Sequence, residues 1–255
     1  MKIEFLDGNV QEFQEACNMF VIAKSISNSL AKKAVAAKID GELYDMSYIL
    51  DHDAKVEFIM PESEEGVEVI RHSAAHLMAQ AVIRLFPGTK VTIGPSIENG
   101  FYYDFDPKEQ FTEEDLLKIE EEMKRLSKED IKVERFMMSR EEAIEYFEKL
   151  GEHYKVEIIK DIAKGEQLSF YRQGEFVDLC RGPHVPSTGH IKSNQIKIRG
   201  GSLLERRFQK QDVAKNLRIC VCNGKRFKRL LKIDGRSGKK RSQKIGKRIG
   251  IVFLE

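Results

Sequence analysis

Apolar residues in the first sixty positions change their spacing twice. Ile3 and Phe5 alternate with polar neighbours and Asp7-Gly8 favours a tight turn, so residues 1–13 are expected to form a hairpin. Between residues 11 and 37 the apolar positions recur at roughly helical spacing, which predicts one or two short helices. Alternation returns over residues 38–60 and predicts strands. The pattern therefore predicts a small α+β domain over residues 1–61.

A polar segment over residues 61–66, containing Pro61 and Gly66, separates this domain from a second one and predicts a linker. Residues 67–86 predict an amphipathic helix that Pro87-Gly88 ends. Beyond it the pattern predicts a hairpin (residues 90–95 and 101–105), two helices (112–128 and 140–150) and three strands (155–159, 169–172 and 175–177). These elements predict a second α+β domain over residues 62–192.

The charge of the chain is divided unevenly along its length. The formal net charge is +2, yet residues 193–255 alone contain 19 Lys and Arg against 4 Asp and Glu. A basic arm of this kind is typical of nucleic-acid binding. The four cysteines are scattered, and no apolar run approaches the ~20 residues that a spanning helix needs. Composition therefore predicts a cytoplasmic protein that does not enter a membrane.

Two pairs of metal-ligating residue types stand far apart in the sequence. His72 and His76 are four residues apart on the predicted helix, so both imidazoles project from one face. Cys180 and His184 form a Cys-x3-His pair in a loop where Gly182-Pro183 favours a turn. Histidine nitrogen and cysteine sulfur are ligands that Zn²⁺ prefers, so the two pairs predict one shared tetrahedral site.

Three stretches make the sequence resemble a known family. EEGVEVIRHSAAHLMAQAV, IGPSIENGFYYDF and FVDLCRGPHVPSTG resemble, in order and spacing, the second domain of threonyl-tRNA synthetases. Residues 1–60 resemble the leading TGS domain of that family, which has a ubiquitin-like β-grasp fold. The resemblance covers about three quarters of the chain. It implies an editing domain, of the threonyl/alanyl-tRNA synthetase second additional type, that hydrolyses mischarged seryl-tRNA(Thr).

The resemblance also implies roles for individual residues. His72 would lie near the terminal ribose hydroxyl, Lys155 would position or activate the water, and Asp178 would hold the substrate ammonium. The other pocket-lining residues would be His76, Tyr103, Cys180 and His184. Taken alone, Lys155 and Asp178 would more commonly be surface charges, and Tyr103 would more often be a core or half-core residue.

Metal use is left open by the resemblance. In the alanyl branch the residues equivalent to His72, His76, Cys180 and His184 hold zinc, whereas in the bacterial threonyl branch the pocket is expected to work without metal. The first alternative to the leading interpretation is therefore a zinc-dependent trans-editing protein of the alanyl type. The second is a non-catalytic RNA-binding module.

The family's activity also involves partners and cofactors. Full-length members are homodimeric, ATP-dependent threonine–tRNA ligases, whereas this chain is expected to lack the aminoacylation core and the dimerising region and to be monomeric. The leading interpretation requires no cofactor, and the expected partner is tRNA(Thr).

Residues 193–255 depart from the family pattern. Plausible codons for this tail, read one nucleotide later, encode a family-like string resembling AYWRGDSKNKMLQRIYG. We therefore expect the tail to be frameshifted and to leave the editing domain incomplete at its C-terminal end. We also expect the tail to have no evolved fold, because a segment with so large an excess of Lys and Arg repels itself.

Overall fold

The computed structural model describes residues 1–92, 94, 96–97, 100–162, 165, 167–193 and 248–251. By packing, the chain divides into two compact units. The first comprises Met1–Ser73, Leu126–Met138 and Gln167–Lys192, and the second comprises Ala74–Arg125, Ser139–Glu166 and Ser193–Glu255. This division by packing differs from the sequence-based division at residue 61, which stays a prediction.

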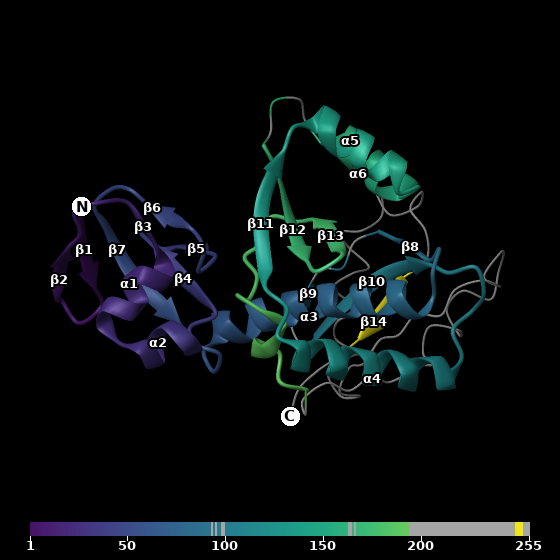
Figure 1. Ribbon diagram of the computed structural model, residues 1–255, viewed down its shortest axis with the longest axis horizontal. Coiled ribbons are helices and arrows are strands. Elements are labelled where there is room, and N and C mark those ends of the chain that lie inside the picture. Colours follow the sequence, from purple (N-terminus) through teal and green to yellow (C-terminus); the bar gives the residue numbers. More distant parts are fainter. Residues whose placement is uncertain are drawn as a thin grey trace, which may run out of the picture. The chain divides into compact units, whose positions relative to one another are not determined.

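The leading part of the first unit has a β-grasp arrangement (Figure 1). Its five-stranded sheet has the order β2-β1-β7-β4-β5, in which β1 and β7 are parallel and the other neighbours are antiparallel. The strands are β1 (Lys2–Phe5), β2 (Val10–Glu12), β4 (Ala36–Ile39), β5 (Glu42–Tyr44) and β7 (Ala54–Ile59). The accompanying elements are α1 (Met19–Ile26), α2 (Asn28–Lys33) and the paired short strands β3 (Cys17–Asn18) and β6 (Ile49–Leu50). The predicted α+β class is confirmed.

Local sequence signals account for the boundaries of these elements. Gly8 adopts φ +80 in the turn of the β1–β2 hairpin, a conformation that glycine adopts without steric cost. The side chain of Asn18 accepts a hydrogen bond from the backbone N–H of Val21 and begins α1, and Ser27 caps α2 in the same way. The apolar faces of the helices and sheet then share one core, whose fully buried members include Ile3, Met19, Ile22 and Leu50.

Helix α3 (Glu64–Leu85) is longer and more deeply buried than the sequence indicates. It begins three residues before the predicted start at residue 67, so the predicted linker is reduced to Pro61–Ser63. Every residue from Ser73 to Val82 is buried, which means that this stretch has no solvent-facing side and the predicted amphipathic pattern is wrong there. Among the described residues, no helix is long and apolar enough to cross a lipid bilayer.

A three-stranded antiparallel sheet completes the first unit. Its strands are β11 (Val133–Met138), β12 (Leu168–Gln173) and β13 (Phe176–Leu179), in that order. The strands predicted at 169–172 and 175–177 correspond to β12 and β13, but β11 was not predicted. Its mostly half-buried and exposed residues have no clear period of two, so its pairing with β12 was not visible in the local pattern.

The second unit contains another small sheet and the remaining helices. In it β10 (Gly100–Asp106) pairs with β8 (Lys90–Val91), β9 (Ser96–Ile97) and β14 (Arg248–Ile251). The helices are α5 (Arg140–Lys149) and α6 (His153–Asp161), together with the part of α3 from Ala74 onward and most of α4 (Glu113–Glu129). Of the predicted hairpin, the second strand corresponds to β10, whereas the first is described as a strand only at Lys90–Val91; residues 93, 95 and 98–99 lie outside the described residues.

The strand predicted at residues 155–159 is wrong, because this segment belongs to helix α6. Val156 and Ile159 are buried and lie three residues apart, which is the spacing of one helical face. Five residues are too few to separate this period from strand alternation. The prediction for residues 193–255 lies outside the described residues except for Ser193 and β14.

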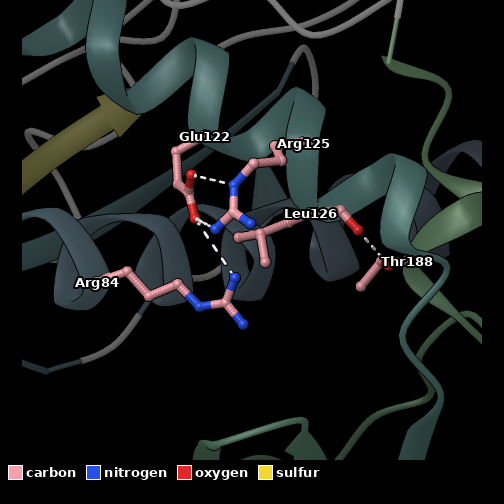
Figure 2. A network of polar contacts seen from close by, with 5 residues as sticks. All are labelled: Arg84, Glu122, Arg125, Leu126 and Thr188. Carbon is pink, nitrogen blue, oxygen red and sulfur yellow. Dashed lines mark hydrogen bonds and ion pairs between the residues drawn. The ribbon is translucent and has the colours of Figure 1, made fainter.

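Within the second unit, Glu122 of α4 is held between two arginines (Figure 2). Its carboxylate accepts from Arg125 at 2.5 and 2.7 Å and from Arg84 of α3 at 3.4 Å. The hydrogen bond from Arg125 is the main cause that lowers the pKa of Glu122. This charge cluster fastens α4 to α3.

Within the first unit, Thr188 fastens the short 3-10 helix Thr188–His190 to the end of α4. Its hydroxyl donates to the Leu126 carbonyl at 2.7 Å, as Figure 2 shows, and accepts from the backbone N–H of Ile131 at 2.8 Å. Thr188 is fully buried. If the hydroxyl were removed, the Leu126 carbonyl and the Ile131 N–H would each lose a hydrogen-bond partner. Water could not replace it without a rearrangement of the structure.

We expect Thr188→Val to lower the free energy of unfolding by about 1–3 kcal/mol, because it keeps the shape of the side chain and leaves two backbone groups without their partner. The measurement is urea denaturation followed by circular dichroism. Thr188→Ser, which keeps the hydroxyl, should retain more of the stability than Thr188→Val. Equal losses in the two variants would show that the hydroxyl is not what matters.

Candidate functional site

Cys180 lies between two histidines in the first unit. Its Sγ is 3.2 Å from Nε2 of His72, on α3, and 3.3 Å from Nε2 of His184, in the loop after β13. The two imidazole rings have centroids 4.3 Å apart. The predicted meeting of the helix pair with the loop pair is thus present for these three residues.

His76 follows His72 by one turn of the same continuous helix, so its imidazole lies on the same helix face. The ligand atoms of His72, His76, Cys180 and His184 all lie within 4.8 Å of one another. Ligands of a tetrahedral zinc with bonds of ~2.0–2.3 Å lie about 3.3–3.8 Å apart. The donor set and its spacing therefore fit a zinc ion after small side-chain adjustments.

The backbone of Cys180 is fixed by strand β12. Its N–H donates to the Ser169 carbonyl at 3.1 Å, and its own carbonyl accepts from the Ser169 hydroxyl at 2.6 Å. The backbone N–H of Gly182 donates to Sγ of Cys180 at 3.4 Å, so the loop folds back on the sulfur.

The Ser73 hydroxyl lies against Nδ1 of His184. The Ser73 hydroxyl donates its single proton to the Val69 carbonyl at 2.8 Å, because a carbonyl can only accept. Nδ1 of His184 lies 3.1 Å from the same oxygen, and it is the donor in that contact when the hydroxyl proton points to Val69. A neutral His184 then carries its proton on Nδ1 and presents the lone pair of Nε2 to Cys180, as a metal ligand or a proton acceptor requires.

His72 is also suited to act in its neutral form. Burial lowers the pKa of its imidazole, although the charge of Asp178 and a hydrogen bond to the Pro183 carbonyl oppose that shift. The ordinary histidine pKa is ~6.5, so a lowered value leaves His72 neutral at pH 7.

Asp178 lies on β13 and is 2% exposed, so it is not a surface charge. It pairs in register with Tyr171 of β12, and its charge acts on His72 in the same unit. A buried carboxylate beside the neutral imidazole of His72 could receive a cationic group such as a substrate ammonium.

Lys155 and Tyr103 lie in the second unit, on α6 and β10. Lys155 is 1% exposed, and its ammonium donates to the Thr92 carbonyl and to the Tyr103 hydroxyl, the latter at 3.4 Å. Tyr103 is fully buried and stacks on Phe105, with ring centroids 5.0 Å apart. Tyr103 thus has the packing of a core residue, and its contact with substrate stays a prediction, as do the roles of Lys155 and Asp178.

Several residues that shape the site were not predicted from the sequence. Asp45 and Tyr171 contact the His184 loop, Ser73 orients the His184 ring, and Gly182 allows the loop to approach Tyr171. A Cβ on Gly182 would lie 1.8 Å from the Tyr171 hydroxyl oxygen, and Gly182 has φ +77. The GPH sequence signalled a turn here, whereas the partners of Asp45 are more than 120 positions away along the chain.

Two family models match the chain. The TGS domain model matches residues 1–60, and the model of the threonyl and alanyl tRNA synthetase second additional domain matches residues 168–218. The second match covers β12, β13 and the Cys180–His184 loop, and it continues into the tail for which we expected no evolved fold.

Curated relatives extend the similarity over most of the chain. The threonine–tRNA ligase of Fusobacterium nucleatum is 56% identical over 237 residues, which is 92% of this chain and 38% of the relative. That of Marinobacter nauticus is 44% identical over 249 residues, or 98% of this chain and 39% of the relative. The chain therefore spans about two fifths of the length of these relatives. With its TGS and second additional domains, it belongs to the threonyl-tRNA synthetase family and corresponds to the N-terminal part of its members.

Proposed function

We propose that this chain hydrolyses the ester bond of seryl-tRNA(Thr) and so removes serine that has been attached to the wrong tRNA. The observation that carries the proposal is the cluster of His72, Cys180 and His184 beside the buried carboxylate of Asp178. A buried group of ionisable side chains with a perturbed pKa is more typical of a reaction site than of a structural core.

The need for such a reaction follows from the two amino acids. Serine lacks one methyl group of threonine, and a difference of that size is worth only ~1–3 kcal/mol in a binding site. Translation requires a larger discrimination, so a second site that hydrolyses the wrong product is the general remedy.

In the proposed reaction, water attacks the ester carbonyl of serine, the bond to the ribose oxygen breaks, and that oxygen takes a proton to become a hydroxyl. Lys155 orients the water, and neutral His72 exchanges a proton at the ribose hydroxyl. Asp178 holds the ammonium of serine by opposite charge and thereby fixes the carbonyl for attack. His76, Tyr103, Cys180 and His184 would line the pocket.

The aminoacylation activity of the complete relatives is not proposed for this chain. The relatives, of which this chain spans about two fifths, are threonine–tRNA ligases. We expect the 255-residue chain to be a cytoplasmic monomer that binds tRNA(Thr) and to show no threonine-dependent exchange of pyrophosphate with ATP. Robust exchange would contradict the proposal that hydrolysis is its own reaction.

We expect the wild-type chain to release serine from seryl-tRNA(Thr) in single-turnover assays with excess protein. Asp178→Asn and Lys155→Met should each lower the rate by about 100-fold or more, because each removes a group that positions a reactant. The measurement is the loss of labelled serine from tRNA, set against threonyl-tRNA(Thr), which should be hydrolysed more slowly.

Matched controls are exposed residues of the same types near α6. Asp161→Asn and Lys160→Met remove the same charges at the end of α6 and should leave the rate unchanged. If the wild-type chain binds tRNA but releases no serine, the chain is an RNA-binding module and the proposal of hydrolysis fails.

A zinc-dependent form of the reaction is the second candidate, and the spacing of the four ligand atoms favours it. His72, His76, Cys180 and His184 would hold the ion, with the Ser73 hydroxyl in contact with Nδ1 of His184. A zinc ion there would supply Lewis-acid polarisation of the ester carbonyl. Asp178 would keep its role toward the ammonium in this form.

Titration with Co²⁺ distinguishes the two forms. If the cluster is a metal site, one equivalent should produce the visible absorption of a tetrahedral ion and a sulfur charge-transfer band, and Cys180→Ser should abolish that band. Cys17→Ser is the matched control and should leave the spectrum unchanged, since Cys17 lies on β3 among the core of the leading sheet. Hydrolysis that persists after chelation, without any cobalt spectrum, would favour the metal-free form.

A further inference from the structure

Asp45, in the loop between β5 and β6, is a buried carboxylate of the leading β-grasp part of the chain. It is 8% exposed and lies in the segment matched by the TGS model. Its Oδ1 accepts the backbone N–H of His184 at 2.9 Å, and its Oδ2 accepts the Tyr171 hydroxyl at 2.7 Å. Nε of Arg135 lies 3.9 Å from Oδ2. All four residues belong to the first unit.

Asp45 holds the backbone N–H of His184 and the hydroxyl of Tyr171, and both residues determine the environment of the His184 imidazole. Tyr171 packs its ring edge-on against that imidazole, with centroids 4.4 Å apart. The backbone N–H of His184 sets where its side chain leaves the chain. The Ser73 hydroxyl contacts Nδ1 of the same ring at 3.1 Å. Asp45 therefore holds the backbone position of His184 and the Tyr171 ring that packs against its imidazole. Ser73 restricts the rotation of the imidazole.

The contacts of Asp45 require an acceptor at both oxygens. The backbone amide and the Tyr171 hydroxyl both donate to it, and an ionised carboxylate can accept at both positions. An asparagine of the same shape would offer one oxygen and one NH₂ group. It would keep both contacts only by turning the Tyr171 hydroxyl from donor to acceptor, and it would lose the negative charge that faces Arg135.

The turn that carries Asp45 is itself anchored in the β-grasp part. The backbone N–H of Tyr48 donates to the Asp45 carbonyl at 3.0 Å, and the N–H of Phe20, in α1, donates to the Met46 carbonyl at 3.2 Å. Met46 is buried in the core of that sheet. The carboxylate thus projects from a fixed turn rather than from a loose loop.

We propose that Asp45 is a positioning residue for the hydrolytic site: through His184 and Tyr171 it holds the Cys180–His184 loop in register with His72. The TGS part then contributes to the chemistry without touching the reacting atoms. The effect on hydrolysis rests on the proposed function, whereas the effect on the geometry of His184 does not.

The test compares Asp45→Asn with wild type in the full 255-residue chain by two readouts. The first is the ¹⁵N and ¹³C NMR signature of the His184 ring without metal, which should show the Nδ1–H tautomer in wild type. In Asp45→Asn it should shift toward a mixture of tautomers. The second is single-turnover hydrolysis of seryl-tRNA(Thr), which should slow on the order of 10–100-fold while the Kd for tRNA changes little.

Asp51→Asn is the matched control, because Asp51 is an exposed carboxylate of the same region whose side chain contacts His52. It should leave both readouts unchanged. If Asp45→Asn does not fold, Tyr171→Phe keeps the ring and removes only the hydroxyl donor, and it should produce the same change in the His184 signals.

The outcomes separate the two proposals. A wild-type His184 signature in a folded Asp45→Asn or Tyr171→Phe variant overturns the positioning role, whatever the hydrolysis rate. A shifted signature in a chain whose wild type releases no serine supports the positioning role and removes the proposed function. A shifted signature with a slowed rate and unchanged tRNA binding supports both.

Discussion

The burial of α3 on every side between Ser73 and Val82 is the constraint on which the rest of the structure depends. A polar side chain in such a stretch costs free energy unless it is hydrogen-bonded within the protein. Ser73 meets this requirement with the Val69 carbonyl, the backbone N–H of Val185 at 3.0 Å and Nδ1 of His184. Satisfying one buried hydroxyl thus brings a distant loop onto the helix and orients one of its imidazoles.

A second buried polar group, the carboxylate of Asp45, also holds the loop. Two separate elements, a helix and the turn of a β-grasp sheet, therefore share one loop of the first unit. This arrangement explains why the compact unit includes both the leading sheet and the β11–β12–β13 sheet, although a sequence-based boundary falls between them. The hydrogen bonds of Tyr171 and His184 to Asp45 cross that boundary.

Local periodicity predicted the elements whose signals lie within a few residues of each other. The β1–β2 hairpin follows from alternation and Asp7-Gly8, and α4 and α5 follow from their apolar spacing. Prediction was wrong for residues 155–159, where five residues could not distinguish a helix from a strand, and it missed β11, whose faces are weakly differentiated.

Site residues could be predicted from the sequence where their side-chain chemistry is distinctive. Residues that matter only through their tertiary contacts could not be predicted. Histidine and cysteine at His72, His76, Cys180 and His184 are uncommon enough to draw attention as ligands, and their clustering was predicted. Asp45, Ser73 and Tyr171 are ordinary residues in the sequence, because their importance comes from partners about 110 or more positions away. Such pairs leave no periodic signal.

The double attachment of His184 has a consequence for movement at the site. Rotating the imidazole breaks its contact with Ser73, and shifting its backbone breaks the contact with Asp45. Residues 180–184 are therefore expected to move as a block or not at all, and a small molecule or ion entering there meets a ring whose rotational entropy has already been lost on folding.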